Sequence, residues 1–372
     1  MLFTPYRLGS MMMPNRIVMA PMSRARAGAG DCATALMAEY YRQRASAGLV
    51  IGESSQISRQ GQGYAWSPGL HTTAQIAGWR RVVDAVHGAG GRIFAQLCHA
   101  GRISHVSFQS DGAAPVAPSA LRATFAKVYI DPRGRGAPSR DGELVCASMP
   151  RALEVDEIRT IVDDFARAAC NAVDAGFDGV ELHGAHGYLI QQFLDPATNL
   201  RQDGYGGSLD GRLRFVCEVA EAVVDAVGPH RVGLRFAPWR AADDVSDTRP
   251  ESDGLALAAR MDALGLAYLN VCEDDQGLRP PLSEAFRRNV RKFYSGTLMY
   301  VGGYSAQRAE NALRAGWADL ISFGRPFIAN PDLPYRLRHG LPLAQGDRST
   351  YFGGAEEGYT DYPEAMVEEA IA

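Results

Sequence analysis

Short apolar runs alternate with longer helix-like segments along this chain of 372 residues, and this pattern narrows the choice of folds more than any other observation. The runs expected as strands are Arg16–Ala20, Leu49–Glu53, Arg92–Leu97, Gly179–His183, Val232–Phe236, Ala267–Val271, Leu298–Val301 and Leu320–Phe323. Most are apolar at consecutive positions, as is typical of strands buried on both faces. The segments expected as helices are Thr34–Ala47, Ile76–Ala89, Glu154–Ala175, Leu209–Val227, Pro250–Leu264, Ser283–Phe293 and Ala306–Ala315. Eight strands separated by helices predict an α/β fold of the (β/α)8, or TIM-barrel, type.

A doubly wound open sheet is the competing architecture. A nucleotide-binding sheet of that kind is indicated by Gly-x-Gly-x-x-Gly directly after its first strand. The residues at that place are Pro21-Met22-Ser23-Arg24, so the barrel is favoured. Since barrels often reach this length as one unit, we expect a single domain over residues 1–372.

Two segments interrupt the alternation. Asp111–Arg151, after the third strand, is rich in Gly, Pro, Ser and Arg and has a weak strand pattern at Ala126–Ile130. It is long for a plain loop, so we expect an excursion with a small hairpin that caps the barrel mouth; the alternative is a disordered surface insertion. The tail, residues 342–372, is irregular but contains four aromatic residues, and we expect it to dock on the body. These four are Tyr351, Phe352, Tyr359 and Tyr362.

Composition excludes several classes of protein. The net charge of −4 is too small to indicate nucleic acid or an anionic membrane as the main partner. No run approaches the roughly 18 apolar residues of a membrane span. The six cysteines are scattered without a Cys-x-x-Cys, which argues against a zinc or iron–sulfur site and is typical of free thiols in the cytoplasm. We expect a cytoplasmic protein that acts on a small molecule, as a monomer or a homodimer.

The segment Glu181–Leu189 carries the strongest chemical signal. His183, His186 and Tyr188 follow an expected strand within six residues. Imidazoles can donate hydrogen bonds to an oxygen that gains charge, and a phenol can deliver a proton. These are the two groups needed to add hydrogen across a double bond conjugated to a carbonyl or nitro group. A metal site that includes Glu181 is the alternative, but no further ligand with suitable spacing follows, and we expect no metal.

The active sites of such barrels lie at the C-terminal ends of the strands. Gly302 and Gly303 follow the seventh strand, and Gly324 and Arg325 follow the eighth, where barrels often bind phosphate. Gln96 ends the third strand, and its amide can pair with a ring edge that carries both a donor and an acceptor. Arg235 ends the fifth strand, and the alternative for it is a simple ion pair at the rim.

Motifs along nearly the whole chain carry a family resemblance. The motifs are Phe3-Thr4-Pro5, Asn15 to Met22, Gly63-Tyr64, Pro68-Gly69, Gln96-Leu97 with His99 and Gly101-Arg102, His183 to Leu189, Gln192-Phe193-Leu194, Asn199, Arg201, Asp203, Tyr205 to Ser208, Arg212, Phe323-Gly324-Arg325, Asn330-Pro331 and Gly358 to Pro363. Together they resemble the old yellow enzyme family of FMN-dependent ene-reductases. The likeness is greatest to its classical bacterial branch, such as the N-ethylmaleimide and pentaerythritol tetranitrate reductases, which reduce enones, nitro compounds and nitrate esters.

The resemblance implies a cofactor, a reductant and a set of residue roles. It implies FMN, reduced by NADPH or NADH, and a ping-pong cycle in which flavin N5 delivers hydride to an activated alkene. His183 and His186 would hold the substrate oxygen, and Tyr188 would protonate the α-carbon. Cofactor contacts are implied for Pro21, Met22, Ser23, Ser54, Gln96, Arg235, Gly302, Gly303, Gly324 and Arg325, and a substrate cleft for Tyr64, Cys98, His183, His186, Tyr351 and Phe352.

Four departures from the family pattern stand out. Ser23 stands where many members have threonine, Cys98 where many have tryptophan, and Phe352 where the tail has a tyrosine. Asp210-Gly211 replaces the usual Glu-Asn beside Ser208. The small side chain of Cys98 predicts a roomier substrate pocket. Two other functions stay open at this point. One is a flavin-free lyase or isomerase that uses His183, His186 and Glu181, and the other is an FMN-binding protein without catalysis.

Overall fold

In the computed structural model, which describes residues 1–134, 136–238, 251–273 and 281–365, eight parallel strands close into a barrel. The strands are β3 (Ile17–Met19), β4 (Leu49–Gln56), β5 (Ile93–Cys98), β10 (Gly179–Gly184), β11 (Val232–Phe236), β12 (Tyr268–Cys272), β13 (Thr297–Val301) and β14 (Leu320–Phe323). They follow one another around the barrel in chain order, and β14 closes the ring on β3. The predicted TIM barrel is therefore confirmed, with strand bounds shifted by a residue or a few.

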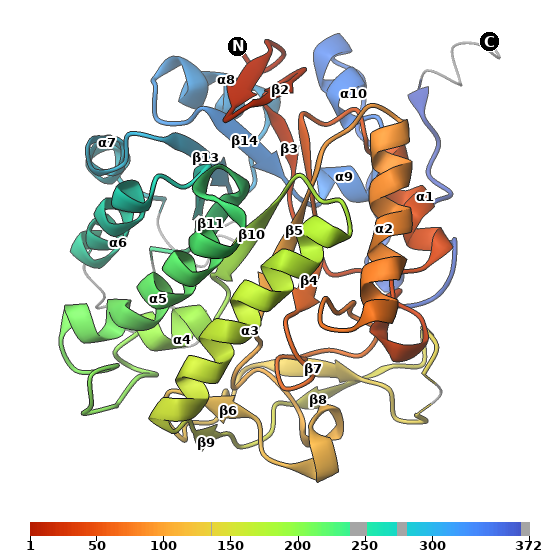
Figure 1. Cartoon of the computed structure of the whole chain (residues 1–372). Helices are drawn as coiled ribbons and strands as arrows, with labels where there is room; N and C mark the ends of the chain where they lie inside the picture. The colour runs from red at the N-terminus through yellow and green to blue at the C-terminus, as the bar shows by residue number, and fades with distance from the viewer. Residues whose placement is uncertain (135, 239–250, 274–280, 366–372) are drawn as a thin grey trace.

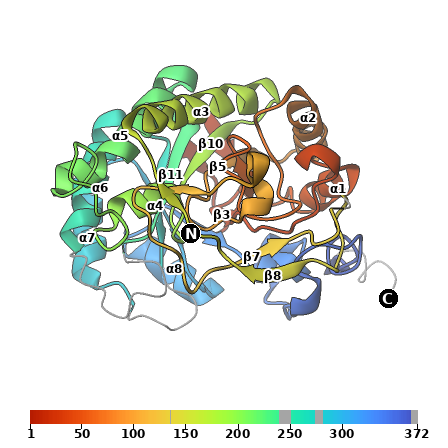
Figure 2. The same ribbon diagram turned by 90° about the horizontal axis from the view of Figure 1, so that it is seen from below.

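Helices surround the barrel, as Figures 1 and 2 show. The seven expected ones are α1 (Ala35–Gln43), α2 (Thr73–Gly88), α3 (Val155–Asp174), α5 (Leu209–Val227), α6 (Glu251–Leu264), α7 (Glu284–Phe293) and α8 (Ala306–Arg314). The start expected for the fifth, Pro250, lies outside the described residues. Three further helices, α4 (Leu189–Leu194), α9 (Pro326–Ala329) and α10 (Leu333–His339), were not predicted. They are too short to show a helical period, and all six residues of α4 are buried.

Alternation along each strand sorts side chains between two sides of the barrel wall. Leu182 and Leu234 belong to the core between the strands and the helices. Inside the barrel, Phe94 and Met299 belong to a second buried cluster. An antiparallel hairpin, β1 (Tyr6–Leu8) and β2 (Met11–Met13), adds Leu8 to this cluster. The hairpin lies at one end of the barrel in Figure 1, so that the opposite end is left for a site.

The expected excursion is present at that opposite end. Two short strands, β6 (Val116–Ala117) and β9 (Arg151–Ala152), pair in parallel at its base. Beyond them β7 (Lys127–Ile130) and β8 (Glu143–Cys146) form an antiparallel hairpin, which lies below the barrel in Figure 1 and faces the viewer in Figure 2. Val128 is buried in a cluster against which Tyr64 and Tyr188 pack. The described part of the excursion, here called the cap, therefore forms two strand pairs, and its role over the barrel mouth stays a prediction.

The tail packs on the body through buried arginines. Tyr359 is fully buried and stacks on Tyr40, with ring centroids 4.0 Å apart. Arg24 donates to the carbonyl oxygens of Tyr351 and Gly358, and Arg26 makes similar bonds to the neighbouring tail backbone. Phe352 differs from the expectation, because 49% of it is exposed. Near Phe352 the tail is therefore held by backbone hydrogen bonds from the two arginines, and at Tyr359 it is also held by the packing of a buried ring.

Candidate active site

Two imidazoles and two phenols meet at the carboxyl end of the barrel. His183 lies in β10, and its ring centroid is 4.8 Å from that of Tyr188 and 5.3 Å from that of His186. The hydroxyl of Tyr188 donates to that of Tyr64 over 3.2 Å. Cys98 ends β5 and lies close enough to both tyrosines to raise their pKa values. The structure thus brings together the three predicted catalytic residues and two of the predicted cleft residues.

A tight turn positions these rings. His186 and Gly187 have φ angles of +57° and +78°, in the left-handed region that glycine adopts without strain. The N–H of Gly187 donates to the side-chain oxygen of Gln191 over 2.7 Å. The N–H of Tyr188 donates to the carbonyl of Ala185 over 3.3 Å and so closes the turn. This reversal places the ring of Tyr188 back against His183.

Both imidazoles are held neutral by their surroundings. Burial lowers the pKa of His183 well below its ordinary value, and the nearby His186 and Arg235 lower it further. Nδ1 of His183 accepts the N–H of Ala185 over 3.3 Å, so its proton lies on Nε2. The protein around His186 and the charge of Arg235 also lower the pKa of that ring, although the residue is exposed at the barrel mouth.

Tyr188, the phenol of this group, stays protonated because it is also held in a buried environment. Burial raises the pKa of Tyr188 well above 10, and Tyr64 and Cys98 nearby raise it further. Arg235 opposes this rise without reversing it. Near neutral pH the group therefore presents two neutral imidazoles and a neutral phenol.

A buried polar layer lies on the neighbouring strands. Gln96 accepts a hydrogen bond from Ser54 and donates to Glu181 over 2.8 Å, and Asn270 donates to the second oxygen of Glu181 over 2.8 Å. Burial raises the pKa of the Glu181 carboxyl, while Arg235 opposes the rise. Both oxygens of Glu181 are therefore engaged by amides. The described residues contain no group of three His, Cys, Asp or Glu side chains suited to a metal, so the metal alternative for Glu181 gains no support.

Small side chains form a platform across the same end of the barrel. Its members are Ala20, Ala185, Ala237, Cys272 and Val301, each at or just after the end of a barrel strand. Because none of these side chains is large, the layer suits the face of a flat ring. Gln96 and Arg235 lie on the adjoining strands and supply an amide and a cation for the polar edge of such a ring.

Two glycine turns that could bind an anion adjoin the platform. Gly302 and Gly303 follow β13 with φ angles of +154° and +60°, and a Cβ atom on Gly302 would lie 2.5 Å from that of Glu273. Gly324 and the exposed Arg325 follow β14. Backbone N–H groups in such glycine turns, together with a guanidinium, suit a phosphate. Pro21, Met22 and Ser23 follow β3, which is paired with β14, and all three are half-buried.

The sequence did not reveal the residues that support the glycine turn after β13. Glu273 is buried and forms ion pairs with Arg287 and Arg308. Arg308 also donates to the carbonyl oxygen of Gly302 over 2.7 Å. In the sequence, Glu273 is marked only by its place just after a strand. That place does not identify its partners Arg287 and Arg308.

Tyr351 and Phe352 do not contact the histidine and tyrosine cluster through any described hydrogen bond or ring contact. The hydroxyl of Tyr351 donates to the carbonyl of Gly346 over 3.4 Å. The ring of Phe352 lies 6.2 Å from that of Tyr129 in the cap. Their assignment to the substrate cleft therefore stays a prediction.

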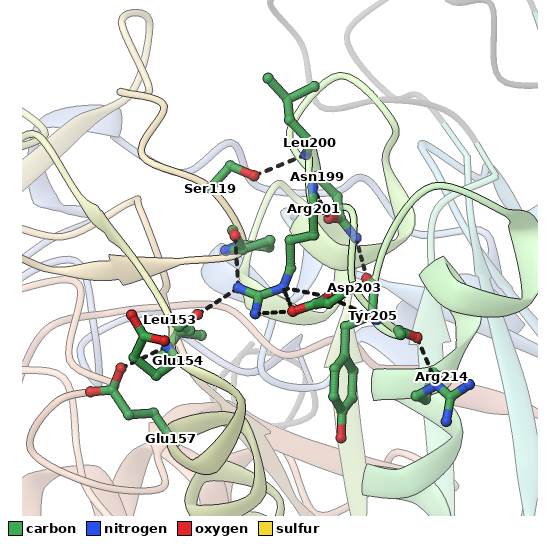
Figure 3. Close-up of polar contacts among 12 residues, drawn as sticks. Ser119, Leu153, Glu154, Glu157, Asn199, Leu200, Arg201, Asp203, Tyr205 and Arg214 are labelled. Atoms are coloured by element: carbon green, nitrogen blue, oxygen red, sulfur yellow. Dashed lines mark hydrogen bonds and ion pairs between the residues drawn. The ribbon is translucent and has the colours of Figure 1, made fainter.

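The motif that runs from Asn199 to Arg212 has a structural task. As Figure 3 shows, Arg201 lies between the cap and the loop that precedes α5. It donates to the carbonyl oxygens of Pro118 and Leu153, which adjoin β6 and β9, and pairs with Asp203. Asn199 donates to the carbonyl of Tyr205 over 2.7 Å. These contacts tie both ends of the cap to the barrel.

The fold and this group of residues are typical of a TIM-barrel enzyme that binds a flat, anionic cofactor. Residues 1–344 match the family described as NADH:flavin oxidoreductase / NADH oxidase. The chain is 41% identical to 12-oxophytodienoate reductase 1 of Oryza sativa subsp. japonica, over 97% of this chain and 92% of the relative. It is 40% identical to a chanoclavine-I aldehyde reductase of Penicillium roqueforti, over 97% and 95%.

Solved structures agree with these relatives. Morphinone reductase is 48% identical and superimposes with a TM-score of 0.93, over 98% of this chain and 96% of that one. The old yellow enzyme homologue from Zymomonas mobilis is 39% identical with a TM-score of 0.90, over 97% and 99%. The chain therefore belongs to the NADH:flavin oxidoreductase family, as an NAD(P)H-dependent FMN ene-reductase of the old yellow enzyme type. The expected fold, cofactor and activity are confirmed, and the flavin-free alternative is set aside.

Proposed function

We propose that His183, His186 and Tyr188 are the catalytic residues and that the substrates are α,β-unsaturated carbonyl or nitro compounds, with nitrate esters as a further class. The observation that carries the proposal is the close group of two neutral imidazoles and a phenol beside the platform. Each of the unsaturated compounds presents an oxygen that gains negative charge when hydride adds to its double bond.

The residues around the platform fit FMN. Gln96 and Arg235 would bind the polar edge of the ring, Ser23 and Ser54 would add hydroxyl groups, and the turns at Gly303 and Arg325 would hold the phosphate. Pro21, Met22, Gly302 and Gly324 would contribute backbone and close packing. When bound at these residues, FMN would supply hydride drawn from the reduced nicotinamide. A guanidinium such as that of Arg235 favours the anionic form of a reduced ring.

The imidazoles stabilise the charge that develops on the substrate oxygen. A neutral ring with its proton aimed at that oxygen gains strength as the oxygen becomes an enolate or nitronate. Nε2 of His183 carries such a proton, because Nδ1 accepts the N–H of Ala185. The pair therefore binds the transition state more strongly than the ground state.

Tyr188 supplies the proton for the α-carbon. Its raised pKa means that the phenol keeps its proton until a strongly basic carbon is formed. The hydroxyl of Tyr64, 3.2 Å away, orients that of Tyr188. The small side chain of Cys98 leaves room beside both rings for substrate.

We also propose that residues 1–372 act as one domain, with 111–151 as its cap and 342–372 as its docked tail. The contacts of Arg201 with the cap and of Arg24 with the tail support this arrangement up to residue 365. No described helix is long and apolar enough to cross a membrane. None of the six cysteines, all of which lie in the described residues, forms a disulfide, which supports a cytoplasmic location.

An anaerobic spectrum of the FMN-loaded protein tests the proposed function. Addition of NADH or NADPH should bleach the flavin absorbance, and subsequent addition of 2-cyclohexenone or a nitroalkene should restore it with formation of the saturated product. A flavin that is reduced by the nicotinamide but is not reoxidised by any of these alkenes would refute the proposed substrate class.

A further inference from the structure

A buried carboxylate ties the glycine turn after β13 to the helix that follows it. Glu273 directly follows β12, and its Oε1 accepts a hydrogen bond from Nε of Arg287 over 3.1 Å. Its other oxygen, Oε2, accepts from a terminal nitrogen of Arg308 in α8. The second terminal nitrogen of Arg308 donates to the carbonyl oxygen of Gly302 over 2.7 Å. The guanidinium of Arg308 therefore bridges Glu273 and the backbone of the turn.

Both guanidinium groups are also held by aromatic rings. The central carbon of the Arg308 guanidinium lies 4.1 Å from the ring centroid of Tyr304, and that of Arg287 lies 5.1 Å from the ring of Trp317. A planar cation that stacks on a ring and pairs with a carboxylate keeps one orientation. The bridge is therefore fixed, although 40% of the Arg308 side chain is exposed.

The bond to Gly302 sets the direction of the next N–H group. The peptide that joins Gly302 to Gly303 is trans, so its carbonyl and its N–H point in opposite directions. Because Arg308 holds the carbonyl, the N–H of Gly303 points away from that guanidinium. Gly303 is exposed, and no described residue accepts a hydrogen bond from its N–H. This N–H is therefore available to an anion at the end of β13.

The register of the barrel brings this donor next to the second glycine turn. Val301 of β13 is paired with Ser322 of β14. Gly303 and Gly324 each lie two residues beyond this pair, where the two neighbouring strands have ended. One phosphate at this end of the barrel can therefore be reached from both turns.

We propose that Arg308 and Glu273 are positioning residues for the phosphate of FMN. Arg308 holds the carbonyl of Gly302 so that the N–H of Gly303 faces the phosphate, and Glu273 holds Arg308. This inference rests on the proposed placement of the phosphate at Gly303. It also has a distinctive sign, because a carboxylate disfavours a nearby anion through its charge alone. Positioning predicts weaker FMN binding when the charge of Glu273 is removed, whereas charge alone predicts tighter binding.

Three variants and a control separate these effects. Arg308→Ala removes the bridge, and it should fold because the side chain is partly exposed. Arg308→Lys keeps a cation that can donate to the carbonyl of Gly302. Glu273→Gln removes the negative charge and leaves one acceptor oxygen for two guanidinium groups. Arg314→Ala is the control for loss of an arginine, because Arg314 lies in the same helix and is also paired with a glutamate.

The experiment compares two flavins that differ only in the phosphate. Full-length protein freed of flavin is titrated with FMN and with riboflavin, and quenching of flavin fluorescence gives both dissociation constants. We expect Arg308→Ala to raise the constant for FMN about tenfold and that for riboflavin by less than about twofold. Arg308→Lys should recover most of the lost FMN affinity. Glu273→Gln should raise the FMN constant about fivefold, and Arg314→Ala should stay within about twofold of the wild type for both flavins.

The possible failures are distinguishable. If Arg308→Ala weakens the binding of FMN and riboflavin equally, or leaves both unchanged, the positioning role is refuted. If Glu273→Gln binds FMN as tightly as the wild type or more tightly, Glu273 has no positioning role. If wild-type protein binds FMN no more tightly than riboflavin, the proposed placement of the phosphate fails, and the positioning role fails with it.

Discussion

The three proposed catalytic residues are kept uncharged by their surroundings. The pKa values of His183 and His186 are lowered and that of Tyr188 is raised, so all three side chains are neutral donors near pH 7. The residue types and their spacing were readable from the sequence. Their protonation was not, because it depends on burial and on Arg235, which comes from another strand.

Replacement of Tyr188 by phenylalanine should separate the two half-reactions. Without the phenol, reoxidation of reduced enzyme by 2-cyclohexenone should slow by about 10²-fold or more, the usual range for loss of a general acid. Flavin reduction by the nicotinamide needs no proton from Tyr188 and should change by about twofold at most. Stopped-flow absorbance measures both steps, and an equal loss in both would contradict the assigned role.

A buried histidine next to the site should make stability depend on pH. Burial lowers the pKa of His99 to about 3, and Nδ1 accepts the N–H of Gly101 over 3.1 Å. The unfolded chain takes up a proton near pH 6.5 that the folded protein does not, so His99 stabilises the fold above that pH and this contribution is lost as the pH falls.

Urea unfolding between pH 5 and 7, at fixed FMN concentration, measures this dependence. Below about pH 6 the substitution His99→Asn should reduce the slope of unfolding free energy against pH by about 1.4 kcal/mol per pH unit. His230→Asn is the control for replacement of an exposed histidine. An unaltered slope in His99→Asn would show that this histidine is protonated in the folded state.

Among the elements, the strands of the barrel were predictable and the short helices were not. Each barrel strand is marked by its own apolar run, whereas α4 and α9 span only six and four residues and are buried among larger elements. The β1–β2 hairpin was missed for the same reason, since each strand has three residues. The cap is held from outside, because Arg201 contacts the backbone at both of its ends.

Removal of this arginine should loosen the cap. Arg201→Ala loses two hydrogen bonds from a largely buried guanidinium to carbonyl oxygens, which should lower the unfolding free energy by about 2 kcal/mol. Limited proteolysis should also become faster within residues 119–150. Arg214→Ala is the matched control, because Arg214 is exposed and donates only to the carbonyl of Gly204 among the contacts in Figure 3. Equal protease resistance in the two variants would argue against Arg201 as the clamp of the cap.

In the molecule as a whole, the tail packs against the loop after β3, which carries part of the proposed site. Arg24 and Arg26 directly follow Pro21–Ser23 and are bonded to the backbone between residues 350 and 358. Tyr359 stacks on Tyr40 beneath them. The two distant parts of the chain therefore support one another through buried contacts.

Substitution of Tyr359 by alanine should affect both stability and the cofactor. Removal of a fully buried aromatic ring should lower the unfolding free energy by about 3 kcal/mol or more. Because the Arg24 loop loses its support, FMN should also dissociate more readily, as measured by fluorescence of released flavin. Tyr362→Ala removes a ring that is only half-buried and should have a smaller effect on both. Loss of stability without any change in FMN affinity would show that the tail does not support the site.

Consecutive residues were enough to predict the eight strands and the barrel, and to single out His183, His186 and Tyr188 as a candidate group. These features depend on local sequence, because the residues of a buried strand and of the turn that follows it are consecutive in the chain. The folded chain was needed to show that Cys98 and Tyr64 lie beside Tyr188, that Cys272 lies beside His186, and that Glu273 supports the glycine turn. Those neighbours come from strands and loops far apart in the chain, and their contacts arise from the register and closure of the barrel, which no local pattern encodes.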